Sequence, residues 1–168
     1  MQRRAFLSLS ASAAALTLSG CGFALRKAPN FAFSTLFSSL GEGSPLGVEL
    51  RRSLQSTRKV EVISDPRRIN EAQVILDVLS DQREKVVLST NTSGQVREFQ
   101  LRLRFRFRLR TLAGKELIPE TEILQQRDIS FNESAVLAKE AEEALLYRDM
   151  QSDVVQQIMR RLAAVTEL

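Results

Sequence analysis

The chain has 168 residues, of which 43% are hydrophobic, enough for one hydrophobic core rather than two. It has no histidine, no tryptophan and a single cysteine, which excludes serine–histidine triads, internal disulfides and cysteine–histidine zinc sites. A hydrolase that uses two carboxylates stays open, but no acidic pair stands in a recognisable catalytic context. The sequence therefore favours a protein that is not an enzyme and that uses neither a metal nor another cofactor.

The first twenty residues have the pattern of an export signal. Arg3 and Arg4 precede an apolar run, Ala5–Leu18, that is too short to form a stable spanning helix. The run ends in Leu18-Ser19-Gly20-Cys21, which matches the lipobox at which lipoprotein signal peptidase cleaves and Cys21 is acylated. The general secretory route and the twin-arginine route both fit this start. We expect a signal peptide over 1–20, an acylated linker over 21–30 and one domain over 31–168.

The residue after the cysteine indicates the destination. Gly22 replaces the aspartate that typically retains such lipoproteins in the inner membrane, which favours the periplasmic side of the cell outer membrane. Two or three acyl chains on Cys21 give stable anchoring, whereas one chain would not.

The first half of the predicted domain combines short strands with one helix. Alternation predicts a strand over Phe31–Phe37, with Phe31, Phe33, Thr35 and Phe37 on one side. Ser44 and Pro45 are a typical cap and first residue of a helix of about three turns that carries leucines at 46, 50 and 54. A short strand over Val60–Ile63 is broken by Asp65-Pro66. Glu71–Thr90 is predicted to be largely extended, with Val74, Leu76 and Val78 on one face and Asp77, Asp81, Arg83 and Lys85 on the other.

The most regular stretch is Phe99–Arg110, and its two faces differ completely. The odd positions are all apolar, and the even positions after Gln100 are Arg102, Arg104, Arg106, Arg108 and Arg110. Strict alternation over this length predicts a long strand with one buried face and one cationic face. Residues 97–110 carry six arginines and one glutamate, a net charge of +5 against +4 for the whole chain. The excess positive charge therefore lies in one strip and is not the broad basic surface of a nucleic-acid-binding protein.

The remaining elements complete the fold prediction. Asn91–Gly94 and Ala113–Lys115 are turns, and a third long strand over Leu117–Phe131 is interrupted by Pro119. A helix then begins with Asn132 or Ser134 as its cap, and it carries an apolar stripe at 146, 150, 154, 158, 162 and 165. We predict an α+β two-layer sandwich in which two amphipathic helices pack on one face of a mostly antiparallel sheet.

Apolar parity also predicts the strand register. A three-residue Ala113–Lys115 loop places Phe105 opposite Ile123, Phe99 opposite Ile129, Arg106 opposite Glu122 and Arg108 opposite Glu120. A four-residue Asn91–Gly94 loop places Arg104 opposite Asp81 and Arg108 opposite Asp77. In these registers Arg102 and Arg110 have no carboxylate opposite.

Three interpretations of the arginine face follow. It is a solvated face whose charges are partly neutralised across the sheet, since such pairs contribute about 0.2–1 kcal/mol each. Alternatively, its guanidinium groups bind the phosphates of lipopolysaccharide, the abundant multivalent anion of this compartment. The third interpretation is contact with an acidic protein surface, such as the wall of a larger β-barrel.

Several short motifs, in order, resemble one family. They are Leu18-Ser19-Gly20-Cys21-Gly22-Phe23-Ala24-Leu25-Arg26, Glu98-Phe99-Gln100, Leu137-Ala138-Lys139, and Tyr147-Arg148-Asp149-Met150 through Arg160-Arg161-Leu162. Together they resemble the LPS-assembly lipoprotein family, LptE, also called rare lipoprotein B.

The resemblance implies an outer-membrane lipoprotein that plugs the large LptD barrel, assists its assembly and binds lipopolysaccharide. It implies lipopolysaccharide binding at Lys139. Taken with the pattern of the arginine face, it predicts barrel or lipopolysaccharide contact along Arg102–Arg110. The basic residue that the family can carry in the hairpin turn is replaced by Thr92, for which Lys85 or Arg97 could substitute. The alternative is an outer-membrane lipoprotein that scaffolds another envelope complex without binding lipid.

Overall fold

The structure is a computed structural model that describes residues 29–168. The expected signal peptide, the acylated Cys21 and the Gly22–Arg26 motif lie outside the described residues. Within residues 29–168, no helix is both long enough and apolar enough to cross a bilayer.

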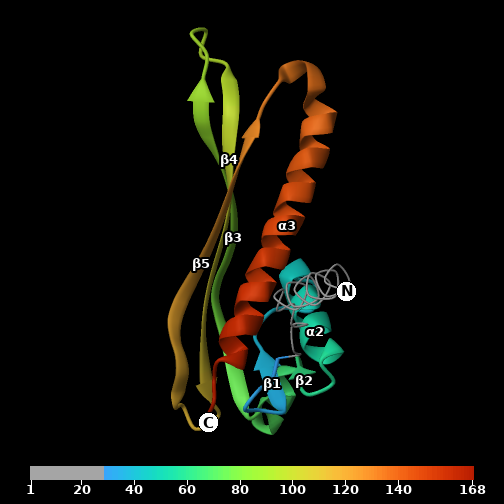
Figure 1. Cartoon of the computed structure of the whole chain (residues 1–168), viewed down its shortest axis with the longest axis vertical. Helices are drawn as coiled ribbons and strands as arrows, with labels where there is room; N and C mark the ends of the chain where they lie inside the picture. The colour runs from blue at the N-terminus through green and yellow to red at the C-terminus, as the bar shows by residue number, and fades with distance from the viewer. Residues whose placement is uncertain (1–28) are drawn as a thin grey trace, which may run out of the picture.

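The sheet has five strands in the order β2-β1-β3-β4-β5 (Figure 1). Its centre is a long antiparallel meander of β3, β4 and β5, and the short β1 runs parallel to both β3 and β2. The strands span Thr35–Ser38 (β1), Glu61–Ile63 (β2), Val74–Thr90 (β3), Val96–Thr111 (β4) and Glu116–Ser130 (β5). Both helices lie on one side of this sheet, so the predicted α+β two-layer fold is confirmed.

The helices begin close to the predicted signals. Helix α2 spans Pro45–Ser56, and the Ser44 hydroxyl accepts the backbone N–H of Gly47 at 3.2 Å, as expected of an N-cap. Asn132 caps a short 3-10 turn, η3 (Glu133–Ala135), by accepting the N–H of Ser134 at 3.1 Å. The long helix α3 follows at once over Val136–Ala163. A second 3-10 turn, η2, spans Pro66–Glu71.

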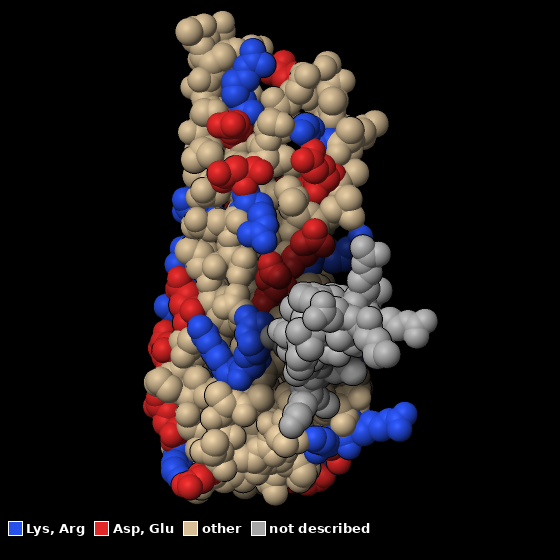
Figure 2. Space-filling view, in the orientation of Figure 1, with Lys and Arg blue, Asp and Glu red and all other residues tan. Residues whose placement is uncertain are grey.

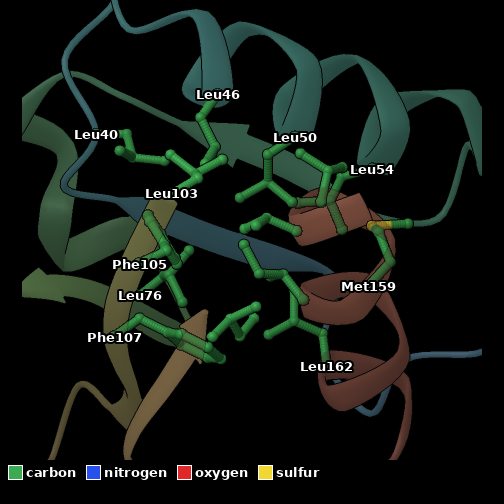
Figure 3. Close-up of a cluster of buried hydrophobic side chains, with 14 of the residues drawn as sticks. Leu40, Leu46, Leu50, Leu54, Leu76, Leu103, Phe105, Phe107, Met159 and Leu162 are labelled. Atoms are coloured by element: carbon green, nitrogen blue, oxygen red, sulfur yellow. The ribbon is translucent and has the colours of Figure 1, made fainter. Parts of the chain in front are cut away.

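The core lies between the helices and the sheet (Figure 3), toward the end of the molecule where α2 lies beside α3 (Figure 1). The apolar phase of β4 is buried from Leu101 to Leu109, as predicted, and each of these side chains is at most 1% exposed. The α2 leucines and the α3 stripe pack against it. Burying one such side chain contributes roughly 1.5–3 kcal/mol, so this layer accounts for most of the stability.

The predicted first strand is longer than the observed one, and its phase is wrong. Strand β1 begins only at Thr35, so Phe33 precedes it and joins the main core with Leu36. Phe37 lies on the other face, in a small cluster with Ile63, Ala72 and Ile75. Because β1 is flanked by strands on both sides and is covered on both faces, its side chains do not alternate between core and solvent.

A β-bulge at Leu79 changes the phase of β3 and corrects the predicted pairing. Val78 pairs with Phe107, and Ser80, not Leu79, pairs with Arg106. Beyond the bulge, the odd residues of β3 face the helices, so Asp81, Arg83 and Lys85 lie on the helix-covered face and not beside Asp77. Consequently Arg104 stands opposite Gln82, whereas the predicted pairing of Arg108 with Asp77 is confirmed.

A second irregularity lies in β5 at Pro119. The predicted pairs Phe105–Ile123, Phe99–Ile129 and Arg106–Glu122 are all present. The register shifts between Phe107 and Leu109, where Pro119 and Glu120 both face Arg108, so the predicted pairing of Arg108 with Glu120 is lost.

Candidate functional site

The arginine row (Arg102, Arg104, Arg106, Arg108 and Arg110) lies on the face of the sheet that the helices leave open. Carboxylates from both neighbouring strands reach into it. The Arg104 guanidinium lies 2.9 Å from Glu122 and 3.8 Å from Glu84, and Arg106 lies 3.5 Å from Glu120. Acidic and basic side chains are interspersed along the margin of the molecule that β5 forms (Figure 2). Most of the row is thus neutralised within the sheet.

Asp77 holds the two arginines at the end of the row. Its carboxylate lies 2.9 Å from Arg108 and 2.8 Å from Arg110. The expectation that no carboxylate stands opposite Arg110 was wrong, because Glu116 of β5 pairs with it in the ladder. In addition, Asp77 of β3 bridges Arg108 and Arg110. Burial opposes ionisation of Asp77, but the hydrogen bonds and charges of Arg110 and Arg108 outweigh it. The pKa of Asp77 therefore lies below its ordinary value.

Arg102 is the exception in the row. Glu84 stands opposite it in the ladder, contrary to the predicted register, yet the Glu84 carboxylate lies against Arg104 instead. Among residues 29–168, Arg102 has no carboxylate within ion-pair distance, and its Nε donates to Gln100 Oε1 at 2.7 Å. Its charge is thus the one in the row left uncompensated inside the described domain.

Lys139 lies in a different place, at the far end of the molecule. It lines a cleft of about 230 Å³ between the start of α3 and the ends of the long strands, which we call the distal cleft. The floor and walls are mainly apolar, and the charged side chains belong to β3 and α3. The lining residues are Lys85, Phe99, Ile129, Ser130, Phe131, Val136, Lys139, Glu140 and Glu143.

Two ammonium groups border this apolar cleft. The Lys85 Nζ lies 2.6 Å from Glu143 Oε2 and 4.4 Å from the centre of the Phe99 ring. The Phe99 ring packs edge-on against Phe131 at 5.3 Å. The Lys139 side chain is only 22% exposed, and its Nζ donates to Ser130 Oγ at 3.0 Å and to Glu142 at 2.8 Å. The cleft thus combines an apolar floor with two lysines, each already paired with a glutamate of α3. An amphiphile suits it if its anionic group replaces those carboxylates at the ammonium groups.

Polar contacts fix α3 immediately beside this cleft. The Tyr147 hydroxyl donates to the Glu84 carbonyl at 2.7 Å, and Arg83 lies over the Tyr147 ring. The same Arg83 donates to Gln151 at 3.0 Å, and Gln151 donates to Glu49 of α2 at 2.7 Å. The helix is thus positioned against β3 and α2, which keeps its first turns at the edge of the sheet.

The structure does not bring the predicted site residues together. The arginine row lies on the open face, whereas Lys139 belongs to the helix that covers the other face. Of the two substitutes considered for a basic hairpin turn, Lys85 lines the distal cleft, and Arg97 lines a neighbouring hollow with Asn132. The exposed Thr92 at the turn lines neither of these two hollows.

Sequence reasoning missed the apolar part of the cleft. Phe99 was assigned to the core simply as one more odd position, and Phe131 and Val136 were not considered as site residues. No local pattern reveals the bulge that brings Lys85 to this cleft, because Val86, Val87 and Leu88 place apolar residues at even and odd positions alike. Within the described residues no group of acidic or cysteine side chains is arranged to hold a metal ion.

Comparison with known proteins extends over nearly the whole chain. The chain is 28% identical over 166 residues to the LPS-assembly lipoprotein LptE of Yersinia enterocolitica, which covers 97% of this chain and 78% of that protein. It is 27% identical over 168 residues to the LptE of Pectobacterium atrosepticum, with 98% and 88% covered.

Solved structures share the fold. An uncharacterised lipoprotein B from Nitrosomonas europaea matches with a TM-score of 0.71 and 35% identity, covering 85% of this chain and 91% of that one. The rare lipoprotein B of Shewanella oneidensis matches in fold, with a TM-score of 0.61 and 24% identity over 77% of this chain and 92% of that one. The family model LptE, described as lipopolysaccharide-assembly, matches residues 30–162. The chain therefore belongs to the LptE family of lipopolysaccharide-assembly lipoproteins.

Proposed function

We propose that this protein is anchored to the periplasmic side of the outer membrane through Cys21, plugs and helps assemble an LptD-type β-barrel, and binds lipopolysaccharide. The single observation that carries the lipid part is the distal cleft, where Lys85 and Lys139 border an apolar floor formed by Phe99 and Ile129. Lipopolysaccharide offers both phosphates and hydrocarbon chains, which match these two kinds of surface.

The separation of the two predicted surfaces supports a division of roles. In our proposal the distal cleft contacts the lipid, and the arginine row contacts the barrel wall. Four of the five arginines have carboxylate partners, and so do both cleft lysines, so ion pairing does not distinguish the two surfaces. The apolar lining of the distal cleft does, because the arginine row is a patterned polar surface that offers nothing to a hydrocarbon chain. Such a surface suits a protein wall with its own alternating charges. An added anion would stabilise Arg102 more than the other arginines, because Arg102 has no carboxylate partner within the described domain.

A mild-detergent pull-down of tagged protein from outer membranes tests the barrel assignment. We expect one large β-barrel in near-equal amount, with lipopolysaccharide in the eluate. Exchange of either cleft lysine for glutamate should reduce the lipopolysaccharide and keep the barrel, and Lys115→Glu, in the β4–β5 turn, is the control with the same change of charge. Recovery with different envelope proteins and no lipopolysaccharide would instead support the scaffold alternative.

A further inference from the structure

Within residues 29–168, the sheet has one long edge whose outer side is free. Strand β5 is terminal in the strand order and spans Glu116–Ser130, whereas the other terminal strand, β2, has three residues. Among the described residues, no strand pairs with the outer side of β5. Exposed edges of this length pair readily with another strand, because alternate backbone N–H and C=O groups remain without partners.

The orientation of one hydrogen bond identifies these free groups. The N–H of Phe131 donates to the carbonyl of Arg97 at 2.7 Å, so Phe131 points its backbone toward β4. Backbone direction alternates along a strand, and the pairing from Ser130 to Thr121 is regular. The N–H and C=O groups that point outward therefore belong to Glu122, Leu124, Gln126 and Asp128.

Among the described residues, features that hinder pairing with another strand occur only toward the two ends of β5. Pro119 interrupts the start of β5. Near the other end, Arg127 covers the Gln126 carbonyl with a 2.8 Å hydrogen bond while it pairs with Asp153 of α3 at 3.0 Å. Leu124 lies between these positions with its side chain 40% exposed. The stretch from Glu122 to Leu124 carries no such protection.

The charge pattern of the open face indicates which kind of strand would fit. Moving across the open face, two carboxylates on β3, Asp77 and Glu84, are followed by the arginine row on β4 and by an acidic column on β5. That last column contains Glu120, Glu122 and Asp128, all exposed. The next strand in this order would place cations beside these carboxylates. A second copy of β5 paired antiparallel about Leu124 would place Glu120 opposite Asp128, which opposes self-association.

We propose that the free edge of β5 is an interaction surface that takes an extended segment of a partner protein as a sixth strand, with arginine or lysine at alternate positions. The backbone of Glu122 and Leu124 supplies the hydrogen bonds. The β5 carboxylates favour the register in which the partner's arginine or lysine side chains lie on the open face of the sheet. This inference goes beyond the lipid and barrel roles and does not depend on them.

The test uses full-length protein in mild detergent and a labelled, end-capped peptide of about eight residues that alternates arginine with valine. We expect saturable binding, with amide exchange at Leu124 slowed by about tenfold or more at saturation. A peptide with glutamate in place of arginine should bind at least about tenfold more weakly, because several cross-strand pairs become repulsive.

Backbone methylation separates strand pairing from simple charge attraction. Only one alternating set of peptide N–H groups faces β5, so N-methylation of that set should abolish binding and methylation of the other set should not. The variant Leu124→Pro should lose binding without losing a β4 hydrogen bond. Equal binding by both methylated peptides, or no binding up to about 1 mM, would overturn the proposal without any variant of the protein.

Discussion

The Lys85 ammonium lies 4.4 Å from the centre of the Phe99 ring, across the β3–β4 pair, on the face of the sheet that the helices cover. This contact exists because of the bulge at Leu79. Up to Val78 the even residues of β3 face the helices, and from Asp81 to Val87 the odd residues do. A cation thereby enters the helix–sheet layer and lies 2.6 Å from Glu143 of α3. The same arrangement places Lys85 and Lys139 on one cleft.

Removal of either cleft lysine should weaken lipopolysaccharide binding. We expect Lys85→Ala and Lys139→Ala each to lower affinity by about tenfold, the effect of losing one charge-assisted contact of roughly 1.5 kcal/mol. Binding of purified variants to immobilised lipopolysaccharide measures this. Lys115→Ala is the control, and a loss as large in that variant would assign the effect to net charge alone.

Asp77 should matter more for stability than Arg102. Asp77→Ala leaves Arg108 and Arg110 without their shared carboxylate, and we expect the free energy of unfolding to fall by about 1–3 kcal/mol. Arg102→Ala, which breaks no ion pair inside the described domain, should change it by less than about 1 kcal/mol. Urea unfolding of both variants decides this, and equal losses would refute the bridging role of Asp77.

The pH dependence of stability should distinguish two aspartates of β3. The pKa of Asp77 lies below its ordinary value of 3.8, so its stabilisation is complete above 3.8 and disappears as the pH falls through its folded pKa. Loss of hydration raises the pKa of Asp81, which Arg83 only partly offsets, so ionised Asp81 destabilises the fold. The free energy of unfolding therefore decreases as the pH rises from 3.8 through the folded pKa of Asp81.

Two asparagine variants test these signs. Asp77→Asn should be less stable than the parent at neutral pH and approach it in acid, whereas Asp81→Asn should be more stable at neutral pH and lose that advantage in acid. Thermal unfolding between about pH 3 and pH 7 provides the comparison. Parallel pH curves for the parent and both variants would contradict the assigned shifts.

A single-residue deletion in β3 should be tolerated. Removing Leu79 leaves Val78 opposite Phe107 and Ser80 opposite Arg106, which is a regular ladder without the extra residue. We expect a loss of less than about 2 kcal/mol and an intact distal cleft. Deletion of Leu103 from β4 shifts register on both sides at once and should prevent folding. Circular dichroism and thermal melts compare them, and unfolding of the Leu79 deletion would show that the bulge itself is required.

Alternation predicted the fold well because burial of one face is a large and local signal. It gave the buried phase of β4, the positions of both turns but not their lengths, and the register of β5 against β4 from Phe99 to Phe105. It failed at Leu79 and at Pro119. At each place the strand contains extra residues that cost little free energy locally, but they change which residues pair across the strands beyond that point. The assignment of Arg83 and Lys85 to the wrong face followed directly from the first failure.

The candidate site was harder to predict than the fold. The sequence identifies Lys139 by resemblance and the arginine row by pattern, but the distal cleft needs the position of α3 relative to the strand ends. Tertiary contacts of Tyr147 and Gln151 set that position, and no local pattern encodes them. The neutralisation of the arginine row also depends on tertiary contacts, because the side-chain positions of Asp77 and Glu122 decide which arginines have an ion pair.

The central claim is that two faces of this protein contact two different partners. A photo-crosslinking amino acid placed at Arg106, on the open face, and separately at Val136, in the distal cleft, tests it in intact cells. We predict that the Arg106 position crosslinks to a large β-barrel and that the Val136 position crosslinks to lipopolysaccharide. Lipopolysaccharide captured at Arg106 and not at Val136, or no barrel captured at either position, would contradict the account.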